Sequence, residues 1–224
     1  MSRVLAVVVA LFLLVAFTPA SAAPLFGTFS LSGVEPVVVS AAAINWGLVS
    51  FSPVGTGNFV GLNNTQGTLA DLNAGPQPVG IPFVLNNFLT ASAQPGWNFQ
   101  LNFLNPGFGN PAGCTDLPGA VCTPGGSLFT ITNDAVGRGS TVQFSMRGLV
   151  FDAGTASPFL ADFSTQFTSL TAAGFLAVVQ AGGSVSSSYS SSWEVGSAPV
   201  PEPASLLLFG TGLVGLRAWR KRRQ

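Results

Sequence analysis

Few residues in this chain could do chemistry, and their types exclude most kinds of catalysis. The 224 residues include no histidine and only two cysteines. Without histidine, neither a Ser-His-Asp site nor an imidazole metal site can form. A glycosidase would need two carboxylates that face each other across a cleft. The acids between residues 23 and 196 lie in or beside predicted turns, so we interpret them as solvated and predict no catalytic residue: Glu35, Asp71, Asp116, Asp134, Asp152, Asp162 and Glu194.

Oxygen ligands for calcium are the one metal chemistry that the sequence allows. Asp71-Leu72-Asn73 and Asn133-Asp134 could each supply carboxylate and amide oxygens. Neither segment completes the pattern of a calcium-binding loop. We therefore predict no metal site and no cofactor.

Cys114 and Cys122 enclose a short loop. In an exported protein this spacing predicts a local disulfide. Closing so short a loop stabilises a fold by about 2–3 kcal/mol on the chain-entropy model. The alternative, a metal site, has no third cysteine and no histidine to complete it. Pairing the two sulfurs would also remove any thiolate nucleophile.

The N-terminus predicts export. A basic residue, Arg3, precedes an apolar run over 4–17, and Ala20-Ser21-Ala22 follows with the A-x-A spacing of a cleavage site. We predict a signal peptide over residues 1–22, cut between Ala22 and Ala23. The alternative is an uncleaved anchor, but the apolar run is shorter than the roughly 20 residues that a membrane span needs.

The predicted mature body, residues 23–196, is acidic. It contains seven acidic residues and two basic ones, Arg138 and Arg147, which gives a net charge of −5. Contacts to phosphate groups come from clustered Lys and Arg. The body is therefore not expected to bind nucleic acid.

Alternating apolar and polar residues predict antiparallel strands in the body. In 97–103, Trp97, Phe99, Leu101 and Phe103 share one face, and similar alternation runs through 141–147 and 159–167. A segment near 170–181 breaks the pattern and predicts one short helix, with Ser169 or Thr171 as its N-cap and Gly182 as its stop. Many short strands and turns predict an all-β, antiparallel β-sandwich of the jelly-roll type.

Four large aromatic residues raise an alternative to a purely structural body. Trp46, Trp97, Tyr189 and Trp193 could form a platform on which sugars stack. No spacing in the sequence marks an exposed aromatic strip, so we interpret these residues, with most of the 19 Phe, as core.

The C-terminal tail, residues 197–224, has three parts in a fixed order. A proline-stiffened motif over 200–203 comes first, then an apolar segment over 204–216 that predicts a single membrane helix, then a basic cluster within 217–223. The basic cluster predicts a cytoplasmic C-terminus and an exported body. The sequence Gly-x-Gly-x-x-Gly within 210–215 is no nucleotide fingerprint, because no βαβ unit surrounds it. The residues are Val200, Pro201, Glu202 and Pro203 in the motif, and Arg217, Arg220, Lys221, Arg222 and Arg223 in the cluster.

This order of elements resembles the PEP-CTERM sorting domain of Gram-negative bacteria. The resemblance covers about 25 of the 224 residues. It implies that Pro201, Glu202 and Pro203 form the recognition motif of an exosortase, a membrane cysteine transpeptidase. That partner would supply the catalytic cysteine, cut near the motif and transfer the body to the cell surface or extracellular matrix. The apolar segment would hold this chain only transiently at the inner membrane.

The sequence therefore predicts an exported, non-enzymatic protein with a structural or adhesive role at the surface or in a biofilm matrix. A polysaccharide matrix is a further predicted partner. The alternative function is a carbohydrate-binding module on the same tail. A third hypothesis concerns the tail alone: it would be a permanent membrane anchor, with no sorting step.

Overall fold

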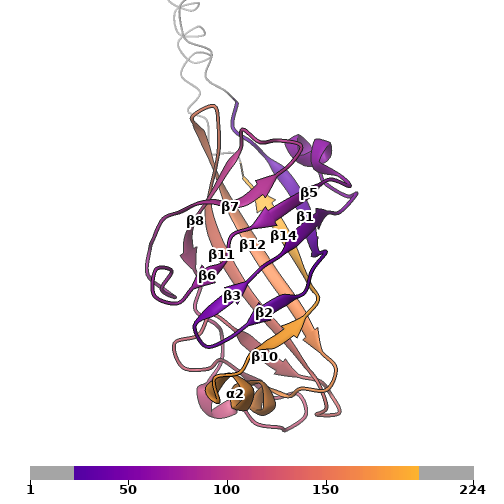
Figure 1. Ribbon diagram of the computed structural model, residues 1–224, viewed down its shortest axis with the longest axis vertical. Helices are drawn as coiled ribbons and strands as arrows, with labels where there is room; N and C mark the ends of the chain where they lie inside the picture. Colours follow the sequence, from indigo (N-terminus) through magenta and orange to yellow (C-terminus); the bar gives the residue numbers. More distant parts are fainter. Residues whose placement is uncertain (1–22, 197–224) are drawn as a thin grey trace, which may run out of the picture.

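The computed structural model describes residues 23–196, which form an all-β body with one α-helix (Figure 1). The helix is α2 (Ala172–Gln180), and two 3-10 turns are η1 (Gly57–Leu62) and η2 (Pro111–Gly113). The strands are β1 (Gly27–Gly33), β2 (Val37–Val39), β3 (Ala43–Asn45), β4 (Leu48–Phe51), β5 (Gln66–Leu69), β6 (Leu72–Asn73), β7 (Leu85–Ala91), β8 (Asn98–Leu104), β9 (Val121–Cys122), β10 (Thr130–Asn133), β11 (Ser140–Asp152), β12 (Thr155–Phe167), β13 (Val185–Ser187) and β14 (Tyr189–Val195).

Eight antiparallel strands close into a barrel. The order β12-β14-β1-β4-β5-β7-β8-β11 returns to its start because β11 also pairs with β12. The prediction of an all-β antiparallel fold is confirmed, but the prediction of a β-sandwich is wrong. The physical reason lies in β11 and β12, each 13 residues long, which pair with each other along their whole length and still leave their other edges free for β8 and β14. Closure removes the open sheet edges that a sandwich would retain.

A second layer covers one end of the barrel. The four-stranded sheet β13-β2-β3-β6 lies in front of the lower part of β11 and β12, and α2 closes this end (Figure 1). Here β11 pairs with β10 instead of β8, and β10 carries the short strand β9. Trp46 packs between the layers, with its ring 4.9 Å from that of Phe163 and 6.0 Å from that of Phe144. This end of the body is therefore a two-layer structure, and the long hairpin of β11 and β12 joins it to the barrel.

Aromatic rings fill the barrel. Trp193 is 1 % exposed and stacks on Phe29 at 5.3 Å, while Phe159 lies 5.0 Å away. The predicted face of 159–167 is confirmed: Phe159, Ala161, Phe163, Thr165 and Phe167 are all buried. In 141–147, Val142 and Met146 are buried as predicted, while Phe144 is half-buried. The interior is thus a continuous apolar core, as the alternation indicated.

One predicted face is wrong at its end. The register between β8 and β11 shifts between Phe103 and Leu101, so Asn102 forms an irregularity in the ladder. Beyond it Leu104 is buried, while Phe103 is only half-buried and pairs with the outward-facing Arg147. A β-bulge of this kind reverses the side chains that follow it, because the side-chain period of a strand is two.

The predicted helix is confirmed, with one of the two proposed caps. The Thr171 hydroxyl accepts a hydrogen bond from the Gly174 amide at 3.2 Å, which identifies Thr171 as the N-cap of α2. Beyond the helix, Gly182 adopts a φ of +80°, a left-handed conformation that glycine adopts without steric cost.

Candidate functional site

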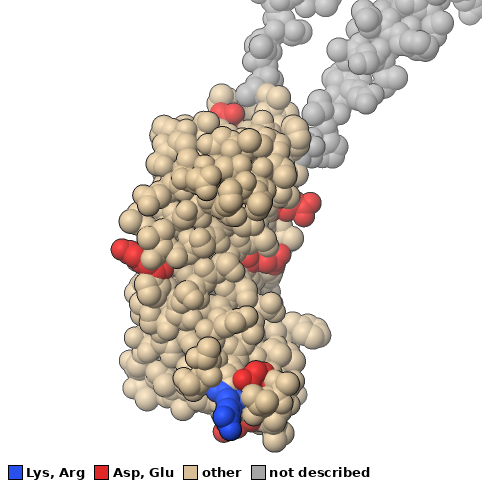
Figure 2. Space-filling model, turned by 90° about the vertical axis from the view of Figure 1, so that its right-hand side faces the viewer, with Lys and Arg blue, Asp and Glu red and all other residues tan. Residues whose placement is uncertain are grey.

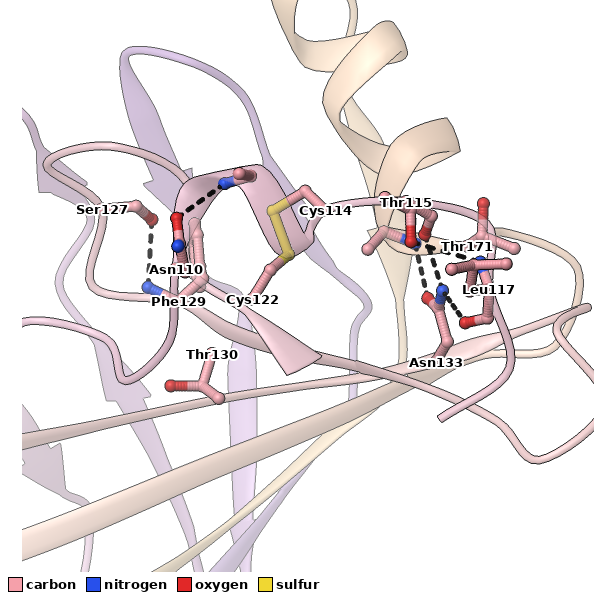
Figure 3. Close-up of a disulfide and its surroundings, with 12 residues drawn as sticks. Asn110, Cys114, Thr115, Leu117, Cys122, Ser127, Phe129, Thr130, Asn133 and Thr171 are labelled. Atoms are coloured by element: carbon pink, nitrogen blue, oxygen red, sulfur yellow. Dashed lines mark hydrogen bonds between the residues drawn. A yellow bond between two sulfur atoms is a disulfide. The ribbon is translucent and has the colours of Figure 1, made fainter. Parts of the chain in front are cut away.

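The predicted disulfide is confirmed. Cys114 and Cys122 are joined, with their Cα atoms 5.1 Å apart, and the bond links η2 to β9 (Figure 3). Residues 23–196 contain no free cysteine. The bond staples a proline-rich loop that has little strand pairing of its own.

The buried side chain of Asn133 helps to tie this loop to the rest of the body. Asn133, 2 % exposed, donates from Nδ2 to the carbonyl oxygens of Thr115 at 2.7 Å and Leu117 at 3.0 Å (Figure 3). Its Oδ1 accepts from the amide of Ala172, in the first turn of α2, at 2.8 Å. The Thr171 hydroxyl also donates to the Asp116 carboxylate. Asn133 therefore joins three elements: the stapled loop, β10 and the start of α2.

The two aspartates considered as calcium ligands accept hydrogen bonds from backbone amides instead. Asp71 accepts from the Trp46 amide at 2.8 Å. The Asp134 carboxylate accepts from the amides of Val136, Arg138 and Gly139 in the turn between β10 and β11. These bonds hold the pKa of Asp134 below its usual value, with the Arg138 amide contributing most. Within residues 23–196, no group of three or more His, Cys, Asp or Glu side chains is placed to hold a metal ion.

The four large aromatic residues do not form an exposed platform. Trp193 and Tyr189 are buried, while Trp46 and Trp97 are half-buried and in contact with other rings. Burial, and secondarily the Glu35 carboxylate, raise the pKa of Tyr189 well above its ordinary value, so its hydroxyl stays protonated. The sugar-stacking surface weighed for these residues is absent from the described body.

A different surface is rich in hydroxyl groups. It is the outer face of β1, β14, β12 and β11. Charged side chains are sparse on the side of the body that Figure 2 shows. Strand pairing places its side chains in two neighbouring rows, which we call the serine face. One row is Ser30, Ser192, Asp162 and Ser145, and the other is Ser32, Ser190, Ser164 and Gln143.

The serine face forms the floor of an open hollow of about 610 Å³. The loop over 106–108 and the residues Leu128 and Thr130 border it on one side. Phe108 stands at this border with 82 % of its surface exposed, and its amide donates to the Thr130 hydroxyl at 2.7 Å. The border therefore carries a large apolar ring whose backbone is tied to the edge of the sheet.

The same outer face continues into a second hollow, of about 630 Å³. Here the next row contains Glu194, Leu160 and Arg147, paired in register across β14, β12 and β11. The Arg147 guanidinium lies 4.2 Å from the centre of the Phe103 ring. This cation–π contact exists because the irregularity at Asn102 turns Phe103 outward.

Both ends of the described chain lie at one pole of the body, opposite α2 (Figure 1). The Leu25 amide donates to the Ser157 hydroxyl at 2.8 Å, and the Gly196 amide donates to the Pro158 carbonyl at 3.0 Å. Neighbouring residues at the start of β12 therefore hold both ends.

Most of the predicted sorting residues lie outside the described residues. These are the signal peptide with Ala22, the motif over 200–203, the apolar segment over 204–216 and the basic cluster over 217–223; Ala23 is the first residue described. Among the helices in the described part of the chain, none is both long enough and apolar enough to cross a membrane. The predicted division into leader, body and tail stays a prediction.

The family model for the PEP-CTERM protein-sorting motif matches residues 199–223, which confirms the predicted resemblance. This motif is a substrate signal for exosortase processing and directs export toward the cell surface. No curated protein and no solved structure matches the chain, so the comparisons describe its tail and not its body.

Proposed function

We propose that this chain is a non-enzymatic protein that an exosortase cuts at the motif over 200–203 and delivers to the cell surface or extracellular matrix. There the barrel would serve as a structural or adhesive unit. The observation that carries the proposal is the match of residues 199–223 to the sorting motif, at the end of an acidic body.

The sequence of the tail supports a transient stay in the membrane. The apolar segment over 204–216 would extend roughly 20 Å as a helix, against about 30 Å for the hydrocarbon core of a bilayer. The basic cluster would hold its far end in the cytoplasm. Pro201 and Pro203 disfavour a helix around Glu202. Glu202 would then lie extended at the outer membrane surface, within reach of a membrane-embedded enzyme.

Features of the body support a role without catalysis. The described acids that make hydrogen bonds through their carboxylates bind backbone amides or the Thr171 hydroxyl, and we infer that they stabilise turns and loops. Because both ends of the body lie at one pole, a body held by its tail would present the opposite pole, with α2 and the disulfide, away from the membrane.

The experiment is to replace Glu202 by Ala in the native host and to measure the intact mass and the location of the mature protein. The wild type is expected to lose the residues that follow the motif and to reach the surface. E202A is expected to keep its tail and to accumulate in the inner membrane. The matched control is Glu194→Ala, which removes an exposed acid from β14 and leaves the motif intact.

Two results would contradict the proposal. An intact tail on the wild-type protein would favour a permanent anchor. Equal processing of wild type and E202A would show that Glu202 is not part of the recognition motif. Processing of the Glu194→Ala control should match the wild type in either case.

A further inference from the structure

We propose that the serine face and its Phe108 border form a binding site for an extended, uncharged polysaccharide. The polysaccharide would lie across β1, β14, β12 and β11, in the hollow of about 610 Å³. It would hydrogen-bond to the floor and rest one sugar ring against Phe108.

The floor has the right polar chemistry. A serine hydroxyl can both donate and accept hydrogen bonds, as sugar hydroxyls also do. Ser190 and Ser192 are exposed, and no hydrogen bond within residues 23–196 engages either hydroxyl. Neighbouring strands are about 4.8 Å apart and successive outward residues about 7 Å apart. The floor therefore offers a regular grid of hydroxyls to a ligand with many hydroxyls of its own; Ser190 and Ser192 are unpaired, while Ser145 accepts a hydrogen bond from Asn105.

The border supplies apolar contact. Sugar rings carry apolar C–H faces as well as hydroxyls, and an exposed aromatic ring can pack against such a face. Phe108 is the most exposed of the large apolar side chains in the described chain, at 82 %. The hydrogen bond from the Phe108 amide to the Thr130 hydroxyl fixes the backbone beside the floor. This limits the conformational entropy that binding would cost.

Other ligand classes fit this surface less well. Protein interfaces are depleted in serine and enriched in aromatic residues, methionine and arginine. Nucleic acids require clustered basic residues, whereas the charged group within this floor is Asp162. A small molecule is usually enclosed on most of its surface, but this hollow is open along the strands. An open, nearly uncharged hydroxyl surface favours a long neutral polymer.

This inference deepens the proposed function, because it gives the adhesive role a partner class. The inference rests on the proposed function in one respect only: delivery to the cell surface or matrix is what would bring the protein to the polysaccharide. Binding itself needs the folded body and not the processing of the tail, so the two proposals can fail separately.

The test is affinity gel electrophoresis of the full chain, produced in an exporting bacterium and purified in mild detergent. The gels contain hydroxyethyl cellulose, galactomannan, xylan or dextran, and a protein of similar size without sugar affinity corrects for sieving. The wild type is expected to be retarded by at least one polymer. Ser192→Trp fills the centre of the floor and should weaken retardation more than tenfold. Phe108→Ala should weaken it by about 2- to 10-fold, the range of an aromatic packing contact.

The controls make the same changes elsewhere. Ser186→Trp places the same ring on β13, at an exposed serine away from the face, and Val136→Ala trims another exposed apolar side chain. Both controls should bind as the wild type does, and circular dichroism should give one spectrum for all variants. No retardation in any gel would overturn the proposal. Retardation that Ser192→Trp and Phe108→Ala leave unchanged would overturn the site.

Discussion

The two poles of the body are held together by different physical means. The barrel pole depends on apolar burial, with Trp193 in contact with rings from several strands. The opposite pole buries rings too, such as Phe175 of α2 against Phe129, but it adds directional links: the disulfide, the three side-chain hydrogen bonds of Asn133 and the capped helix α2. The difference follows from pairing. The barrel strands satisfy their backbone groups in ladders, while the proline-containing loop between β8 and β10 has few ladder partners and needs side chains and a covalent bond.

This comparison predicts which changes damage the whole body and which damage one pole. Apolar burial is shared among many neighbours, so its loss should reduce global stability. A directional link connects a few named groups, so its loss should first release the elements that it joins. Thermodynamic and local measurements together can separate the two effects.

The largest effect is expected from Trp193→Ala. Removing this ring leaves a cavity in the middle of the barrel, and such replacements cost about 3–5 kcal/mol. Denaturant unfolding should show the loss, and hydrogen exchange should accelerate in β1, β12 and β14 together. The control is Trp97→Ala, because Trp97 is half-buried and should lose clearly less. Equal losses for the two variants would contradict a core centred on Trp193.

Asn133→Ala should cost about 2–4 kcal/mol. It removes the side-chain donor to the Thr115 carbonyl oxygen and the acceptor of the Ala172 amide, while the Leu117 carbonyl oxygen keeps the Ala120 amide as a donor. A buried group left unpaired costs about 1–3 kcal/mol. Hydrogen exchange should accelerate first in 115–121 and at the start of α2. The matched control, Asn105→Ala, removes one side-chain bond to Ser145 at a half-buried position and should cost about 1 kcal/mol. Uniform acceleration throughout the barrel would argue against a local role for Asn133.

Replacing both Cys114 and Cys122 by Ser should cost about 2–3 kcal/mol. The short loop limits the effect, because the entropy of closing a loop grows with its length. Unfolding curves of the wild type with and without a reducing agent give an independent estimate of the same quantity. A reductant that shifts the curve of the double variant as well would show that the effect does not come from this bond.

The alternation of residues was sufficient to predict most buried faces. In β11 and β12, apolar residues at every second position correctly indicated which side chains fill the core. Thr171 and Gly182 marked the ends of α2 because caps are local signals. These features depend on neighbours in the sequence, so the sequence alone could reveal them.

Closure of the barrel could not be predicted in this way. It depends on which distant strands pair at the free edges of β11 and β12, and alternation is the same in a sandwich and in a barrel. The outward turn of Phe103 depends on a register shift against β11, which no residue in 97–103 announces. Phe108 was missed for a similar reason: its Gly- and Pro-rich surroundings indicated a loop but not the sheet edge beside it.

The smallest effect should be a pH dependence confined to the turn between β10 and β11. The Asp134 pKa is lowered in the folded state, so the carboxylate stabilises the fold above its unfolded pKa, about 4, and this contribution fades as the pH falls through the lower folded value. Asp134→Asn should therefore be less stable than the wild type at neutral pH, and the two should converge in acid. The control is Asp162→Asn, which changes an exposed carboxylate on the outer face of β12, outside this turn. A stability difference between Asp134→Asn and the wild type that stays constant down to acid pH would mean that Asp134 acts through its shape. Convergence of the two stabilities in acid would show that its charge holds the turn. That charge would then be a directional link of the same kind that sets this pole apart from the barrel.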